Sequence, residues 1–169
     1  MSKKNNMLPH LAQFVLDNGL TASSLRPMAK AAGTSDRMLI YHFGSKIGVL
    51  RETLDFIASQ LTVTLDGLFA NRIFASEAEL IRSVTDLFRA ETFRPFVLLW
   101  LDIVSEAARG SDLHRDVGSR IIDSYIEWIG KYHPQGPKKA AETLIKIDGS
   151  MIIDAVGRHD LTDGFLKNL

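Results

Sequence analysis

The sequence predicts an all-α fold, in which a short N-terminal group of three helices is followed by a longer helical region. Apolar residues recur at three- and four-residue spacing in nearly every segment. No segment alternates polar and apolar residues as a half-buried strand would, and no internal repeat appears. Glycine, proline and serine fall between the periodic segments, where helices begin and end.

The first three helices are predicted from their caps. The first spans Leu8–Asn18, and Gly19 ends it. Ser24 is a good N-cap for a short second helix, and Gly33 suits the left-handed residue that often follows a helix. Ser35 then caps the third helix. Two short helices that meet at a glycine-containing turn are typical of a helix-turn-helix.

Five further helices and a tail are predicted after this group, and proline and glycine separate several of them. They span residues 44 or 45 to about 71, Glu77–Ala90, Pro95–Arg109, residues 111 or 112 to about 132, and Lys138–Arg158, followed by a short tail at Leu161–Leu169.

Composition excludes several classes of protein. The chain has 169 residues, of which 46% are hydrophobic and 24% charged, as in an ordinary globular protein. It contains no cysteine, which excludes a disulfide framework, a thiolate metal site and a thiol nucleophile. The first thirteen residues lack an apolar core, and the apolar run at residues 95–101 is too short to cross a bilayer. We therefore expect a cytoplasmic protein.

Charge is unevenly distributed, although the formal net charge is zero. Residues 1–60 hold seven basic and four acidic side chains, and the remaining residues hold thirteen basic and sixteen acidic. A cationic N-terminal part joined to an anionic remainder is typical of a DNA reader with a separate regulatory domain.

The segment Thr34–Lys46, TSDRMLIYHFGSK, resembles the N-terminal signature of TetR-type transcriptional regulators. Gly19 and the segment Ser24–Gly33 also match, so the resemblance covers about residues 7–50. It implies a DNA-binding domain at residues 1–47 and a helical effector-binding and dimerisation domain at residues 48–169. It further implies a homodimer that binds a palindromic double-stranded DNA operator and responds to a small molecule.

The candidate DNA contacts lie on the second and third predicted helices and at the start of the fourth. An arginine in the third helix, Arg37, is placed to form a two-pronged hydrogen bond with guanine, whereas Lys46 at a helix start suits phosphate. For His42, packing at the helix corner is an equal alternative to a phosphate contact. The full set is Arg26, Lys30, Thr34, Ser35, Arg37, Met38, Tyr41, His42 and Lys46.

The sequence departs from the family pattern at two places. Ile40 stands where the family usually has a tyrosine whose hydroxyl contacts DNA, so Tyr41 is left to supply a hydroxyl. The N-terminal arm is short, with only Lys3 and Lys4 ahead of the first predicted helix.

The helix predicted over Lys138–Arg158 is the candidate dimer interface, because it combines apolar with small residues. The interface residues expected there are Leu144, Ile145, Asp148, Met151, Ile152 and Ala155. The alternative is that this apolar stripe is core within one protomer.

The middle helices carry bulky residues that would suit an effector pocket, with one carboxylate, Asp102, among them. The candidates are Phe56, Phe69, Phe88, Phe96, Trp100, Asp102, Ile103, Tyr125 and Trp128. An aromatic stripe at helical spacing is also what a plain core contains.

Nothing in the sequence indicates an enzyme, a metal site or a cofactor. The five histidines form no pair at helical ligand spacing, and no phosphate-binding loop or nucleophile motif occurs. The acidic and histidine residues Asp112, His114 and Asp116 open a helix, where aspartate is favoured as a cap. The sequence thus favours a ligand-responsive repressor. The alternative is a helical small-molecule carrier or protein-interaction dimer that has lost DNA binding.

Overall fold

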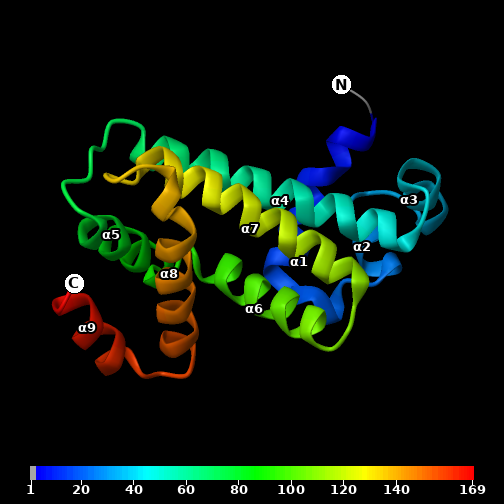
Figure 1. The fold of residues 1–169 in the computed structure, drawn as a ribbon. Coiled ribbons are helices and arrows are strands. Elements are labelled where there is room, and N and C mark those ends of the chain that lie inside the picture. The colour runs from blue at the N-terminus through cyan, green and yellow to red at the C-terminus, as the bar shows by residue number, and fades with distance from the viewer. Residues whose placement is uncertain (1–2) are drawn as a thin grey trace. The chain divides into compact units, whose positions relative to one another are not determined.

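The computed structural model describes residues 3–169, and this part of the chain is helical without strands, which confirms the all-α prediction. Figure 1 shows the order of the elements. They are α1 (Lys3–Ala22), α2 (Leu25–Ala31), α3 (Asp36–Phe43), α4 (Lys46–Phe69), α5 (Glu77–Arg89), α6 (Arg94–Ala108), α7 (Asp112–Tyr132), the 3₁₀ turn η1 (Pro137–Lys139), α8 (Ala140–Ala155) and α9 (His159–Lys167).

The two ends of the chain are more helical than the sequence indicates. Helix α1 begins at Lys3, so Lys3 and Lys4 belong to a helix and do not form an arm, as the sequence suggested. The ammonium of Lys4 forms an ion pair with Glu52 at 2.6 Å and lies 5.2 Å from the centre of the Phe43 ring. These contacts fix the first turn of α1 against α3 and α4. At the other end, the predicted tail is largely the helix α9.

The chain divides into two compact units, each assembled from separate stretches of sequence. One contains residues 1–63 and 98–121, and the other contains residues 64–97 and 122–169. These units do not follow the division at residue 47, and that domain boundary stays a prediction.

The first unit contains α1, α2, α3, the first part of α4 and much of α6 and α7. Its core consists of fully buried apolar side chains, among them Leu11, Val15, Met28, Leu39, Val49, Leu54 and Val117. Burial of a side chain of this size contributes roughly 1.5–3 kcal/mol relative to exposure. A chain of ion pairs also links α4 to α7, since Arg120 contacts both Asp55 and Asp116, and Asp116 also contacts Arg51.

The α1 helix of this unit is interrupted at Gly19, where φ is 74°. The following backbone amide, of Leu20, donates a hydrogen bond to the carboxylate of Asp102 at 3.3 Å. An added Cβ at Gly19 would lie 3.3 Å from the same carboxylate. Asp102 therefore fixes α6 to the end of α1.

The second unit is organised by the packing of α5 on α8 and α9. Helix α5 buries Leu80, Ile81 and Val84, and α8 buries Leu144 and Ile147. A single arginine, Arg89, connects all three helices, because it contacts Asp154 at 2.6 Å and Asp163 at 2.8 Å. Burial is the largest single influence and raises the pKa of the Asp154 carboxyl, but hydrogen bonds from Arg89 and Thr162 and the charges of Arg89 and His159 together lower that pKa.

No helix in the described part of the chain is both long enough and apolar enough to cross a lipid bilayer.

Candidate functional site

The turn between α2 and α3 has the geometry that the sequence predicts. Gly33 adopts φ 63°, and the amide of Thr34 donates to the carbonyl of Ala29 at 2.9 Å. Ser35 is the N-cap of α3, and its hydroxyl oxygen accepts a hydrogen bond from the amide of Met38 at 3.3 Å. Ser24 caps α2 by position only, since its side chain makes no capping hydrogen bond.

The corner between α3 and α4 is also built from small residues. Gly44 has φ 80°, and Ser45 accepts a hydrogen bond from the amide of Gly48 at 2.9 Å. A Cβ at Gly48 would lie 2.1 Å from the carbonyl oxygen of Phe43, so only glycine fits this close approach. Gly48 therefore allows the end of α3 to pack closely against the start of α4.

One face of α3 is buried and the opposite face is open. Leu39 is fully buried and Phe43 is 6% exposed, so these two side chains anchor the helix to the core. Tyr41 is 77% exposed, and Arg37 is exposed beside it. The helix thus presents to solvent the two side chains on which the interpretation as a recognition helix depends.

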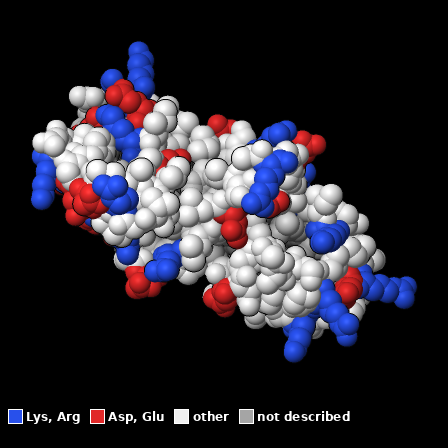
Figure 2. All heavy atoms as spheres, turned by 90° about the horizontal axis from the view of Figure 1, so that it is seen from below, with Lys and Arg blue, Asp and Glu red and all other residues white. Residues whose placement is uncertain are grey.

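The cations of this region have no acidic partner. Arg26, Lys30, Arg37 and Lys46 are all exposed, and none forms an ion pair with any residue of the described chain 3–169. Most other lysines and arginines do pair with carboxylates, as Arg89, Lys131 and Lys146 show. Figure 2 shows lysine and arginine side chains projecting at the right-hand end, where Figure 1 draws α2 and α3. These four side chains are free to meet phosphate.

The remaining DNA candidates differ in access. Ser35 and Met38 are exposed, and Thr34 is half-buried. His42 is half-buried as well, and its ring packs edge-on against Tyr41 with centroids 5.1 Å apart. The Nε2 atom of His42 is shielded from solvent and has no hydrogen-bond partner in the described chain. This placement favours packing at the helix corner over a phosphate contact.

Three of the predicted pocket residues meet in the second unit. Phe88, Tyr125 and Trp128 line a small enclosed cavity of about 20 Å³, together with Asp148 and Met151. Burial raises the pKa of Asp148 to about 6, and burial together with the charge of Asp148 raises the pKa of the Tyr125 hydroxyl. A carboxylate among aromatic rings is suited to a polar or cationic group.

The other pocket candidates are divided between the units. Phe69 is buried in an aromatic cluster with Phe74, Trp128 and Tyr132, and Phe96 contacts Phe93. Phe56, Trp100, Asp102 and Ile103 belong to the first unit. Asp102 has a structural partner there in the Leu20 amide, and Ile103 is 2% exposed.

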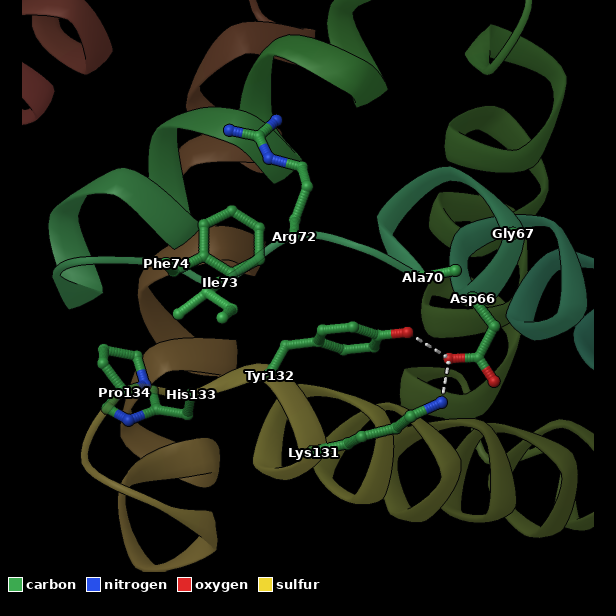
Figure 3. A pocket seen from close by; sticks show the side chains of 10 residues that line it. All are labelled: Asp66, Gly67, Ala70, Arg72, Ile73, Phe74, Lys131, Tyr132, His133 and Pro134. Carbon is green, nitrogen blue, oxygen red and sulfur yellow. Dashed lines mark hydrogen bonds and ion pairs between the residues drawn. The ribbon is translucent and has the colours of Figure 1, made fainter.

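A larger open cleft of about 620 Å³ in the second unit was not predicted from the sequence. In Figure 3, Lys131 and Tyr132 both point at Asp66, and the Asp66 carboxylate lies 2.9 Å from each of their polar atoms. Hydrogen bonds from Lys131 lower the pKa of Asp66. Asp66 lies 65 residues before Lys131, and no sequence motif connects it with Lys131 and Tyr132.

The candidate interface residues on α8 lie on two different faces. Ile145 and Ile152 are 73% and 49% exposed, and Ala155 is exposed as well. Leu144, Asp148 and Met151 instead line the enclosed cavity, so they belong to the interior of the unit. The exposed apolar stripe consists of Ile145, Gly149, Ile152 and Val156, which recur at helical spacing.

No cluster of three or more histidine, aspartate or glutamate residues that could hold a metal ion occurs within residues 3–169.

No protein-family model matches the chain. Three curated proteins are similar in sequence. The HTH-type transcriptional repressor KstR2 of Mycolicibacterium smegmatis is 25% identical, over 83% of this chain and 84% of its own. The regulatory protein RaaS of Mycobacterium tuberculosis is 25% identical, over 74% of this chain and 58% of its own. The regulator BetI of Rhizobium meliloti is 31% identical, over 59% of this chain and 49% of its own.

Solved structures share the fold. A structure described as a TetR-family transcriptional regulator from Rhodococcus has a TM-score of 0.72 at 18% identity, covering 98% of this chain and 95% of that one. A transcriptional regulator from Saccharomonospora viridis, solved in complex with choline, has a TM-score of 0.65 at 20% identity, covering 98% of this chain and 93% of that one.

Proposed function

We propose that this chain is a TetR-type transcriptional regulator, and more closely a ligand-responsive repressor that binds a palindromic operator as a homodimer, because it shares its fold with such a regulator and is similar in sequence to a repressor. The observation that carries the proposal is the helix-turn-helix, whose outward face is open and whose cations Arg26, Lys30, Arg37 and Lys46 form no ion pair within residues 3–169. In this proposal Arg37 contacts a guanine edge, and Arg26, Lys30 and Lys46 contact phosphate. Thr34, Ser35 and Tyr41 add hydroxyl donors to the phosphates.

A homodimer is needed because one helix-turn-helix covers only a few base pairs. Two recognition helices separated by about 34–36 Å read successive major-groove faces of a palindrome. The exposed stripe of Ile145, Gly149, Ile152 and Val156 supports α8 as the contact between the two copies. An apolar stripe of this length is rarely left open to water in a protein that acts alone.

The proposed effector site is the cavity lined by Phe88, Tyr125 and Trp128, which at about 20 Å³ has room for a single water and must widen to admit a small molecule. A small molecule that enters it lowers operator affinity only if it binds the DNA-free conformation more tightly than the DNA-bound one. The choline complex of the Saccharomonospora viridis regulator supports a small-molecule effector as a class. We further propose that the protein acts without catalysis, cofactor or metal, and in the cytoplasm.

The deciding experiment is selection of bound fragments from the source genome with the purified protein, followed by titration of the enriched duplex at several salt concentrations. We expect one palindromic sequence to be enriched, with affinity falling steeply as salt rises, because each phosphate contact releases counterions. If no duplex is enriched and retention on random DNA is independent of salt, the protein is a carrier or interaction module and the proposal is wrong.

The homodimer is tested separately by sedimentation of Ile145→Asp, which places a charge on the exposed stripe. We expect this variant to sediment as a monomer, with Val63→Asp as a matched control because Val63 on α4 is 64% exposed, against 73% for Ile145. A dimer that persists in Ile145→Asp would exclude α8 as the interface.

A further inference from the structure

The outward face of α3 carries two exposed apolar side chains, Met38 and Ile40. Besides Arg37, Tyr41 and, in the first turn, Asp36, the exposed side chains of α3 are Met38 and Ile40, each 37% exposed. On a helical wheel these two lie on either side of Arg37 and Tyr41. Close by, at the start of α4, Ile47 is 56% exposed. The exposed hydrogen-bonding side chains of α3 are therefore one guanidinium, one phenol and one carboxylate at the first turn, which leaves the middle of the surface to Met38 and Ile40.

These apolar side chains are bordered by the four unpaired cations, and Asp36 is the sole acidic residue between Asp17 and Glu52. Exposed carbon surrounded by free positive charge is complementary to a major groove. The groove edges carry phosphates, and one base edge on its floor carries an apolar group, the 5-methyl of thymine.

We propose that Met38 and Ile40 are specificity-determining residues that read thymine by packing on its 5-methyl group. Neither side chain has a hydrogen-bond donor or acceptor, apart from the weakly accepting sulfur of Met38. Against guanine, adenine or cytosine, each would bury an unpaired polar atom of the base, which is unfavourable. Against thymine, each side chain leaves water and packs on the apolar 5-methyl group. The operator half-site therefore contains thymine in the part of the groove that α3 covers.

This inference rests on the proposed DNA-binding function and names the base that Met38 and Ile40 recognise. Ile40 is central to it, because a hydroxyl-bearing tyrosine there would favour a hydrogen bond, whereas isoleucine allows packing alone. Removal of one buried methyl from the contact is expected to lower affinity about fourfold.

The test uses the full-length protein and the enriched operator duplex, in which each thymine of one half-site is replaced in turn by deoxyuridine. Deoxyuridine lacks only the 5-methyl group and keeps all base-pairing atoms. We expect about a fourfold loss of affinity at one or two thymines and no loss at the others. The same substitutions are then measured with Ile40→Ala and Met38→Ala.

In these variants the thymine that contacts the missing side chain should become insensitive to deoxyuridine, because the methyl has lost its partner. Val63→Ala, a matched loss of exposed carbon on α4, should keep the full sensitivity of the native protein. Circular dichroism measures whether each variant is folded. We expect both to fold, because Met38 and Ile40 are only partly buried.

The inference is overturned if the operator binds specifically but every deoxyuridine duplex binds as well as the parent. It is equally overturned if the loss is the same in Ile40→Ala and Met38→Ala as in the native protein. Both results leave the proposed function intact. Failure to enrich any duplex overturns the proposed function itself, so the two failures are distinguishable.

Discussion

The basic side chains differ between two regions of the molecule. Those of the second unit form ion pairs that join helices, whereas those around α2 and α3 are exposed and form none within residues 3–169. In the second unit, Arg89 holds α5 to α8 and α9, and Lys146 pairs with Glu77 across α5 and α8. Around the recognition helix, Arg37 and Lys46 pair with nothing in the described chain. A cation in an ion pair contributes to folding, whereas a cation without one contributes little to folding and remains available to a partner.

The largest expected effect comes from Gly48→Ala, which moves the free cations without removing them. The added Cβ would lie 2.1 Å from the Phe43 carbonyl, so α3 must shift relative to α4. We expect a loss of about 1–3 kcal/mol in the free energy of unfolding, measured by urea denaturation. Operator affinity should fall by more than about tenfold, measured by fluorescence anisotropy.

Gly67→Ala in the same helix is the control, because no atom lies within 4 Å of its added Cβ. This substitution should be neutral or stabilise the protein by up to about 1 kcal/mol. Equal stability of the two variants would show that the α3–α4 corner tolerates a side chain.

Arg37→Ala and Lys46→Ala distinguish a cation that contacts a base edge from one that contacts phosphate. Arg37→Ala should cost about 1–3 kcal/mol of binding free energy at one base pair and relax sequence preference there. Lys46→Ala should weaken specific and random duplexes alike and reduce the salt slope by about one. Neither should change the urea midpoint, since neither side chain has a partner to lose. The assignment of roles is wrong if the two variants behave identically on both duplexes.

Arg89→Ala should show the reverse pattern. Because the Arg89 guanidinium is partly exposed, we expect a discounted loss of about 1–2 kcal/mol in the free energy of unfolding. Asp154 would keep His159 as an ion-pair partner, at 3.1 Å. Arg158→Ala, which breaks an exposed pair with Asp160, is the control and should be close to neutral. A thermal unfolding series measures both, and equal losses would contradict the role assigned to Arg89.

The smallest expected effect concerns pH. Burial raises the pKa of Asp148 to about 6, so the folded protein binds this proton more tightly than the unfolded chain does. The contribution of this group to stability is therefore greatest at low pH and falls as pH rises from about 4 to about 6. At pH 7, Asp148→Asn should stabilise the protein by about 1 kcal/mol. The gain should vanish near pH 4, and a constant gain from pH 4 to 7 would contradict the assignment.

Local signals explain what could be predicted from the sequence. The helix-turn-helix depends on residues a few positions apart, such as Gly33 before Ser35, and it was confirmed in place. The role of Asp102 could not be predicted, because its partner, Leu20, is 82 residues away. The cleft at Asp66 likewise requires Lys131, which is 65 residues away. On α8 the helix was predicted but its faces were mixed, because an apolar stripe does not indicate which side is covered. Which residues touch DNA stays a prediction.

The two faces of α8 are offset by a single residue along the chain. Leu144, Asp148 and Met151 line the cavity, and Ile145, Gly149 and Ile152 follow each of them directly on the outside. A helix moves as a rigid body, so a small molecule that displaced the inner row would move the outer row as well. The wall of the cavity and the proposed dimer surface are thus two faces of the same helix.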